Sequence, residues 1–239
     1  MSTSEETVWS AKIAGMPLKV WSALVIELAL FAALLFVSAG TLYWPAAWIF
    51  LALFALGAIP GSIDLAKHNP GLLDERMKWP IQPNQPLWDR VLMMTLFVLV
   101  VALFVVPGLD VRWGWSRVPL WLQIVGGITL LVTFYSFLVT MRHNPYLASV
   151  VRIQKERGHK VISTGPYAIV RHPFYAAAIP FFPAIGLLLG SWWAVFLSLL
   201  VIAILAYRAV NEERLLEQEL EGYADYMKRV RHRLIPCVW

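Results

Sequence analysis

The last apolar stretch of the chain, residues 173–207, contains no charged residue over 35 positions. As a single α-helix it would be about 52 Å long, well beyond a bilayer core of about 30 Å. It therefore predicts two antiparallel spans that turn near Gly190 and Ser191, with Pro180 and Pro183 bending the first span. Such a hairpin returns the chain to the side of the membrane from which it entered.

Four further apolar stretches precede this hairpin. The chain is 59% hydrophobic and 15% charged, with a mean hydropathy of +0.64, values typical of integral membrane proteins. The first stretch contains Glu27, whose charge is costly in lipid and suggests a packed or functional partner. We predict an all-α fold, a polytopic integral membrane helical bundle of about six transmembrane helices. Its spans are residues 20–40, 41–63, 91–106, 118–141 and the two arms of 173–207.

The distribution of basic residues predicts how the bundle is oriented. Six spans place both termini on one side, and 18 of the 20 Lys and Arg residues then fall on that side. Only Arg112 and Arg117 fall on the other. The positive-inside rule therefore predicts cytoplasmic termini, and we expect a multi-pass protein of the bacterial inner membrane. Basic loops at an anionic leaflet explain the net charge of +5 without a nucleic-acid partner.

The N-terminus and the cysteine content exclude or weaken several other classes. A cleaved signal peptide, with its site at residues 37–39, competes with a first span, but the apolar run is long and the preceding tail acidic for such a segment. Cys237 is the only cysteine, which excludes a disulfide framework and a cysteine-rich metal site. The histidines lack a tight ligand spacing, so no metal is predicted.

Polar residues gather at the two ends of the hairpin. Residues 171–173, Arg-His-Pro, precede it, and Arg208 and the Glu212–Glu213 pair follow it. Proline suits the first turn of a helix, where free backbone N–H groups and the positive dipole end favour an anionic group such as a carboxylate. If the arms are antiparallel, both sets meet at one cytoplasmic edge. Carboxylates bind an amine and arginine binds a carboxylate, and an amino-acid-like cofactor end carries both groups.

Three cytoplasmic segments connect or follow the spans. The 64–90 loop predicts a connector with one short helix and a proline-rich turn, or a rim for a substrate. Residues 152–157 form a charged, helix-like patch that Gly158 ends. After Arg208, apolar residues at spacings of four and three predict an amphipathic C-terminal helix, weakened at Gly222, that lies on the membrane or folds back under the spans. The residues of this stripe are Leu216, Leu220, Tyr223, Met227 and Val230.

These motifs resemble a known family over roughly residues 140–236. The pattern is Gln154, the block Gly165-Pro-Tyr-Ala-Ile-Val-Arg-His-Pro-Phe-Tyr175, an apolar hairpin, Arg208-x-x-x-Glu-Glu213, and Tyr223-x-x-Tyr226. It is similar to the isoprenylcysteine carboxyl methyltransferase family and its relatives, the phospholipid methyltransferases. The residues before 140 match only as hydrophobic spans.

The resemblance implies an integral membrane methyltransferase that uses S-adenosyl-L-methionine. Residues 1–140 would supply about four spans, and residues 141–239 would form the catalytic region, with a cofactor-binding loop, the hairpin and the C-terminal helix. The partners would be the lipid bilayer and a lipidic or small hydrophobic acceptor with a carboxylate, amine or thiol. By matching position, the cofactor-binding residues are Gln154, Gly165, Tyr167, Arg171, His172, Pro173, Tyr175, Glu212 and Glu213, and the catalytic residues are Arg208, Glu212 and His172.

The sequence departs from the family pattern at a few packing positions and leaves alternatives open. The glycine usual soon after the last tyrosine of the block is replaced by Ala176 or Ala177, and the acceptor and the oligomeric state stay open. One alternative is a membrane reductase that binds NADPH phosphates with Arg152, Lys155, Arg157 and Lys160. The other is a non-enzymatic sensor or transport protein, for which Glu27 is the best feature.

Overall fold

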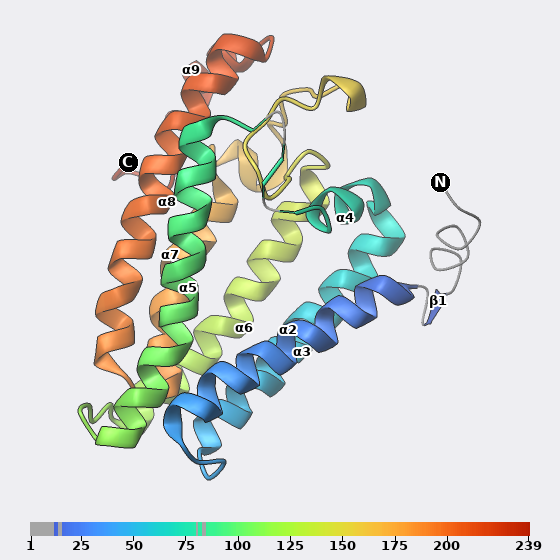
Figure 1. Ribbon diagram of the computed structural model, residues 1–239. Coiled ribbons are helices and arrows are strands. Elements are labelled where there is room, and N and C mark those ends of the chain that lie inside the picture. Colours follow the sequence, from blue (N-terminus) through green and yellow to red (C-terminus); the bar gives the residue numbers. More distant parts are fainter. Residues whose placement is uncertain (1–11, 14–15, 80, 83–84) are drawn as a thin grey trace.

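The computed structural model describes residues 12–13, 16–79, 81–82 and 85–239. The regular secondary structure of this part is helical, apart from a small antiparallel hairpin of β1 (Lys12–Ile13) and β2 (Met16–Pro17). Six apolar helices form the bundle (Figure 1): α2 (Leu18–Ala39), α3 (Pro45–His68), α5 (Leu87–Trp113), α6 (Leu120–His143), α7 (Pro173–Leu189) and α8 (Trp192–Glu219). Short elements lie at one end of it: α4 (Pro70–Arg76), η1 (Lys155–Arg157), η2 (Gly165–Ala168) and α9 (Tyr223–Arg229).

The predicted all-α membrane bundle is confirmed. In the described part of the chain, five helices are long and apolar enough to cross a membrane, namely α2, α3, α5, α6 and α8. The remaining apolar helix, α7, has 17 residues, or about 26 Å, slightly less than a bilayer core of about 30 Å. The short arm of the hairpin therefore accounts for the difference between five long helices and the predicted six spans.

The hairpin turns where its sequence predicts. Gly190 ends α7 with a left-handed φ of 80°, which glycine adopts without steric cost. Ser191 then caps α8, because its Oγ accepts a hydrogen bond of 3.2 Å from the amide of Ala194. The same hydroxyl donates to the buried carboxylate of Asp110, 2.5 Å away, and this bond ties the turn to α5. At the other end Pro173 is the first residue of α7, as predicted.

Close backbone contacts hold α6, α7 and α8 together. Gly126 of α6 lies against α7, where an added Cβ would come within 2.8 Å of the carbonyl oxygen of Ala184 and of the amide nitrogen of Leu188. Gly186 of α7 faces α8, with its Cβ position 2.7 Å from the amide nitrogen of Val195. Small residues allow such approach between membrane helices. Around this layer α5 packs on α8 and α2, and α3 packs on α6 and α2.

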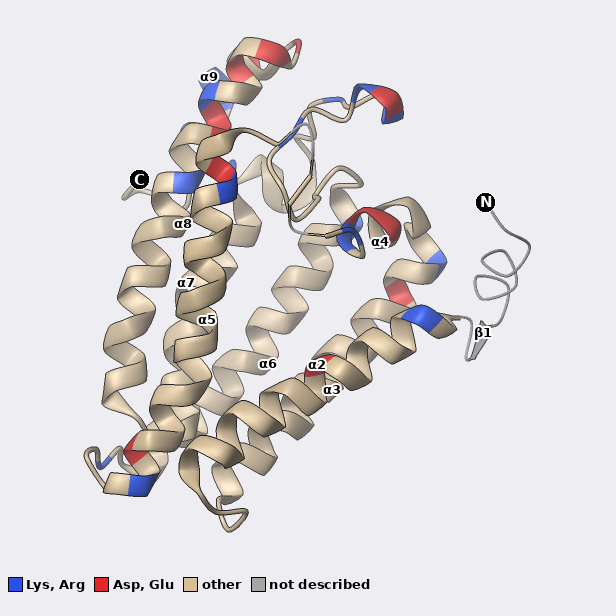
Figure 2. Cartoon of the chain, in the orientation of Figure 1, with Lys and Arg blue, Asp and Glu red and all other residues tan. Residues whose placement is uncertain are grey.

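Apart from Glu27 of α2, the charged residues of the described part lie at or near the two ends of the bundle (Figure 2). The connection between α3 and α5, the loop of residues 144–172, and α9 share one end, and Arg112 and Arg117 lie at the other. This grouping is the one that the predicted orientation requires, and the assignment of the cytoplasmic face stays a prediction. Glu27 interrupts the apolar body of α2, and its side chain is exposed.

Several helices extend beyond the predicted apolar spans. α3 continues to His68, through Pro60, instead of ending at residue 63, and α5 covers 87–113 instead of 91–106. The backbone hydrogen bonds of a helix do not require apolar side chains, so a helix continues with charged residues after it leaves the bilayer. The predicted short helix of the 64–90 loop is α4, whereas Pro80 and Pro83 of the proline-rich turn, like the acidic N-terminal tail, lie outside the described residues.

The C-terminal region is divided differently from the prediction. Residues 208–219 continue α8 without a break, and the amphipathic helix is reduced to α9 after Gly222, which has a φ of 82°. This segment packs on the loop of residues 144–172, where Leu220, Tyr223, Tyr226 and Val230 contact Ile153 and Val161. The charged patch 152–157 forms only the short η1, and Arg152, which precedes it, binds Glu75 of α4 and Glu156.

Candidate active site

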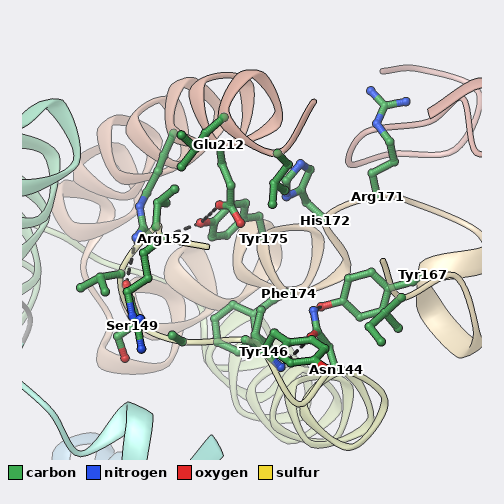
Figure 3. Close-up of a pocket in the computed structure, with 18 of the residues that line it drawn as sticks. Asn144, Tyr146, Ser149, Arg152, Tyr167, Arg171, His172, Phe174, Tyr175 and Glu212 are labelled. Atoms are coloured by element: carbon green, nitrogen blue, oxygen red, sulfur yellow. Dashed lines mark hydrogen bonds between the residues drawn. The ribbon is translucent and has the colours of Figure 1, made fainter. Parts of the chain in front are cut away.

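A cavity of about 420 Å³ opens at the end of the bundle that carries the loops (Figure 3). Its volume lies within the range of roughly 300–1,000 Å³ typical of ligand sites. Polar groups line its outer part, including Asn144, Tyr146, Tyr167, His172, Tyr175, Arg208 and Glu212. Apolar side chains of four bundle helices line the part inside the bundle, including Met93, Leu96, Phe137, Phe181 and Leu205. The cavity therefore joins a polar mouth to an apolar interior.

A buried ion pair supports the wall formed by α8. The guanidinium of Arg208 donates through Nε to Oδ1 of Asp89 at 2.7 Å, and Asp89 is fully buried in the first turn of α5. Asp89 also accepts from the side chain of Gln85 at 2.7 Å and from the amide of Val151 at 3.0 Å. Arg208 further donates to the carbonyl of Ser149 at 2.9 Å. These hydrogen bonds offset the cost of burying the carboxylate of Asp89. They also hold the loop against two helices.

Tyr175 links this ion pair to Glu212. Arg208 Nη1 donates to the Tyr175 hydroxyl at 3.0 Å, and the hydroxyl donates to Oε2 of Glu212 at 2.7 Å (Figure 3). The ring of His172 stacks on that of Tyr175, with centroids 5.5 Å apart and planes at 11°. This hydrogen bond is the one side-chain bond that Glu212 makes among the described residues, so its carboxylate keeps free acceptor positions at the cavity.

Glu213 is bound by three cationic or imidazole side chains. Arg171 donates to both of its oxygens, at 2.6 and 3.2 Å, and Arg233 donates to Oε2 at 2.7 Å. Nε2 of His172 lies 3.1 Å from Oε1. Glu213 is buried and, unlike Glu212, does not line the cavity. It therefore cross-links α8, the start of α7 and the C-terminal segment.

Arg171 points away from the cavity centre and binds the C-terminal segment. Figure 3 shows its guanidinium turned away from His172 and Tyr175. Besides Glu213 it binds the carbonyls of Val230 and Arg231, at 2.9 and 2.8 Å. The backbone amides of Arg171 and His172 donate to the carbonyls of His232 and Arg233, so the two segments run side by side. The Arg-His-Pro block is thus held in place by the chain terminus.

The loop of residues 144–172 is ordered by internal hydrogen bonds. Gln154 is 1% exposed, donates to the carbonyl of Tyr146 at 2.7 Å and accepts from Arg157 at 2.5 Å. The Tyr167 hydroxyl accepts from Asn144 at 2.9 Å, and the carbonyl of Tyr167 accepts from the hydroxyl of Tyr226 at 2.7 Å. Burial raises the pKa of Tyr167, so the phenol stays protonated.

His159 lines the cavity as a neutral imidazole. Its ring stacks on Tyr146 with centroids 4.4 Å apart, and its Nδ1 accepts from the amide of Gln154 at 3.4 Å. Burial, helped by the charges of Arg157 and Arg152, lowers the pKa of His159 to about 4. The ring therefore offers a flat aromatic surface and no charge at neutral pH.

The structure brings most of the residues predicted for the site to one cavity. Tyr167, Arg171, His172, Tyr175, Arg208 and Glu212 line it. Four predicted residues do not line the cavity and lie behind the residues that do, namely Gln154, Gly165, Pro173 and Glu213. Gly165 has a φ of 58°, and an added Cβ would come within 2.2 Å of the His143 ring, so this position accepts only glycine.

Sequence reasoning missed the residues that approach the site from the N-terminal half. Asp89 and Arg76 belong to α5 and α4, and neither has a motif around it. The position of Asp89 in the first turn of an apolar span could have predicted its role, because a buried carboxylate there requires a cationic or hydrogen-bonding partner. Asn144 and Tyr146, in the loop after α6, gave no signal.

Residues 121–221 match the family model described as phospholipid methyltransferase. The matched segment contains nearly all of α6, the whole of α7 and α8, and the loop between α6 and α7, and thus most of the cavity lining. The chain matches no curated protein. The fold and the match together define a helical membrane protein whose C-terminal half is similar to membrane methyltransferases. They support the predicted resemblance to phospholipid methyltransferases. Residues 1–120 lie outside the match.

Proposed function

We propose that this protein is an integral membrane methyltransferase that uses S-adenosyl-L-methionine. The observation that carries the proposal is the position of Glu212, His172 and Tyr175 in one cavity within the segment that matches phospholipid methyltransferases. The cavity joins a polar mouth, suited to a water-soluble cofactor, to an apolar interior, suited to a lipidic acceptor. Both kinds of ligand can then meet inside one site.

The residues present fit the methionine end of the cofactor, which carries an ammonium and a carboxylate. Glu212 has free acceptor positions for an ammonium or a hydroxyl group. α7 begins at Pro173, and its N-cap His172 makes no side-chain bond to the first-turn amides, so these amides suit a carboxylate. Tyr146 and His159 offer stacked rings for a planar base. In this proposal Gln154, Gly165, Pro173, Arg171 and Glu213 position the lining and do not contact the ligand.

The cofactor would supply an electrophilic methyl group on a sulfonium. The chain contributes alignment, since a held near-attack geometry lowers a barrier by about 7–11 kcal/mol. A carboxylate acceptor is already ionised and needs no base. An amine or thiol needs to lose a proton, and His172 is placed to take it. In this proposal Nε2 of His172 donates to the Glu213 carboxylate, 3.1 Å away, and Nδ1 is the atom that takes the proton.

Arg208 has a supporting role in this proposal. Its guanidinium is occupied by Asp89, Tyr175 and the Ser149 carbonyl, and it orients the Tyr175 hydroxyl toward Glu212. Its remaining edge lines the cavity, where it would face the acceptor. A prenylated cysteine carboxylate, as in the isoprenylcysteine methyltransferases, and a phospholipid amine, as in the matched family, are the acceptors to test first.

Calorimetric titration of the purified protein with S-adenosylhomocysteine tests the cofactor assignment. We expect Glu212→Gln to weaken binding about 10- to 100-fold, because a hydrogen bond to a charged group contributes about 1.5–3 kcal/mol. Glu217→Gln on the same helix, where the side chain is exposed, is the matched control and should bind as the wild type does. Equal affinity in Glu212→Gln and the wild type would exclude Glu212 as a ligand.

Two further measurements test the function itself. Incubation with methyl-labelled S-adenosylmethionine and fractionated membrane lipids, followed by mass spectrometry, should give a labelled lipid product. Titration with NADPH tests the reductase alternative. That alternative is weakened because Arg152 and Arg157 are bound by Glu75, Glu156 and Gln154. A wild-type protein that binds NADPH and not S-adenosylhomocysteine would overturn the methyltransferase proposal, and one that binds neither would favour a non-enzymatic role.

A further inference from the structure

Arg76, at the end of α4, carries a positive charge to the cavity without a carboxylate partner among the described residues. Its Nη1 donates to the carbonyl of Leu147 at 3.1 Å, and its guanidinium lies 5.2 Å from the ring centroid of Phe174. The two acidic residues of α4 are bound elsewhere, since Glu75 pairs with Arg152 and Lys78, and Asp74 pairs with Lys19. A guanidinium has five N–H donors, so most of those of Arg76 remain available.

The surroundings of Arg76 penalise its charge. Burial lowers the pKa of Arg76, and the nearby Arg208 acts in the same direction. The charge of Arg208 is balanced by Asp89, whereas no described carboxylate balances that of Arg76. A partly buried guanidinium without a counter-charge is costly, and an anionic ligand in the cavity would reduce that cost.

The apolar part of the cavity begins directly at Arg76. Phe174, which lies under the guanidinium, packs on Phe137 with centroids 4.5 Å apart, and Phe137 packs on Phe181 at 5.3 Å. Phe137 lies six residues from the end of α6 and Phe181 eight residues from the start of α7, so the aromatic rings reach about 9–12 Å down the bundle. A cation at the top of an apolar well matches a molecule with an anionic head and an apolar tail.

We propose that Arg76 binds a carboxylate or phosphate of the methyl acceptor and selects anionic amphiphiles over neutral ones. The identification of this ligand as the methyl acceptor rests on the proposed function, whereas the binding of an anionic amphiphile does not depend on catalysis. Arg76 comes from α4, outside the segment that matches phospholipid methyltransferases, so it would add a specificity element from the N-terminal half. Arginine suits this task because its planar donors bind carboxylate and phosphate in pairs.

The test measures binding of simple amphiphiles to the full-length protein in nanodiscs. Dodecyl phosphate and dodecanoate are the anionic probes, and dodecanol is the neutral one. For the wild type we expect both anions to raise the melting temperature more than dodecanol does at equal concentration. Arg76→Gln should reduce apparent affinity for the anions at least tenfold and leave that for dodecanol unchanged. Arg76→Lys should retain part of the preference, because it keeps the charge and loses the paired donors.

Control variants separate anion binding by Arg76 from a structural role of the same side chain. Arg214→Gln removes an exposed arginine of α8 and should behave as the wild type does. An equal loss for all three probes in Arg76→Gln would mean a structural role and would overturn the inference. A loss of S-adenosylhomocysteine affinity with unchanged amphiphile binding would assign the anion to the cofactor and would also overturn it. A wild type that binds the anionic probes without binding S-adenosylhomocysteine would contradict the proposed function and leave the anion site in place.

Discussion

Single residues at the cavity divide into those with free donors or acceptors and those that are already saturated. Glu212 and Glu213 are neighbours in the chain, yet successive residues on a helix point about 100° apart. Glu212 therefore faces the cavity with one hydrogen bond, and Glu213 faces three partners behind it. The sequence motif treats the two carboxylates as a pair, but their physical tasks differ.

His159 gives a pH-dependent prediction at the residue scale. Its pKa is lowered from 6.5 to about 4 in the folded protein, so between these values the unfolded chain binds the proton and the native protein does not. Its contribution to stability is present above pH 6.5 and is lost as the pH falls through about 4. We expect this loss to reach about 1–2 kcal/mol, reduced from the full shift because the ring is partly exposed.

Melting temperatures of the wild type and His159→Gln at pH 7 and pH 5 check this prediction. The variant should lose less stability than the wild type between the two values, because glutamine does not titrate. His68→Gln removes an exposed histidine and should keep the loss seen in the wild type. If His159→Gln and the wild type fall equally, His159 is not the buried neutral group that we describe.

At the scale of elements, the α6–α7–α8 layer sets the position of the site. Pro173 starts α7 directly after His172, so any shift of α7 against its neighbours moves His172 and Tyr175 relative to Glu212. Gly126 and Gly186 allow the close contacts that fix this distance. α8 adds stiffness, because it continues past the apolar span and carries Arg208 and Glu212 on one unbroken helix.

Adjacent glycines of α6 provide a matched pair for testing this packing. Gly126→Ala would place a methyl group 2.8 Å from backbone atoms of α7, so we expect a loss of about 1–3 kcal/mol and weaker S-adenosylhomocysteine binding. Gly127→Ala meets only side-chain carbons, 3.5 and 3.7 Å away, and should be neutral or stabilise by up to about 1 kcal/mol through helix propensity. Denaturation in detergent measures both. Equal stability of the two variants would contradict the proposed tight contact between α6 and α7.

At the scale of the whole molecule, the bundle separates a basic end with the cavity from an end with only Arg112 and Arg117 as described basic residues. The positive-inside rule predicts that the cavity end faces the cytoplasm, the side from which the proposed cofactor would enter. Cys237 is exposed at this end and is the single thiol of the chain, so it reports the orientation directly.

Labelling with a membrane-impermeant maleimide checks the orientation. In right-side-out vesicles Cys237 should stay unlabelled until the membrane is permeabilised. The control carries Cys237→Ser together with Arg117→Cys, which moves the thiol to the exposed connection between α5 and α6, and it should react without permeabilisation. Labelling of Cys237 in sealed vesicles would reverse the predicted topology and place the cavity on the outer side.

The amino-acid sequence by itself determined the class of fold. Uncharged stretches of about 20 residues cross a bilayer as helices, and a stretch of 35 residues exceeds one bilayer, so the hairpin follows from length and hydrogen bonding. Its turn follows from the glycine at position 190, which ends α7. The same hairpin brought Arg208 and Glu212 back toward His172, and most of the predicted site residues line one cavity.

Only the tertiary structure decided which groups are free to act. Burial and hydrogen-bond partners come from elements far apart in the sequence: Asp89 of α5 binds Arg208 of α8, and the C-terminal segment binds Arg171. No local pattern specifies such pairs, because each depends on how helices pack. The structure therefore assigns Glu213 to the framework and leaves Glu212 and Arg76 facing the cavity, since a charge with unused hydrogen-bond capacity there is the one that a ligand can satisfy.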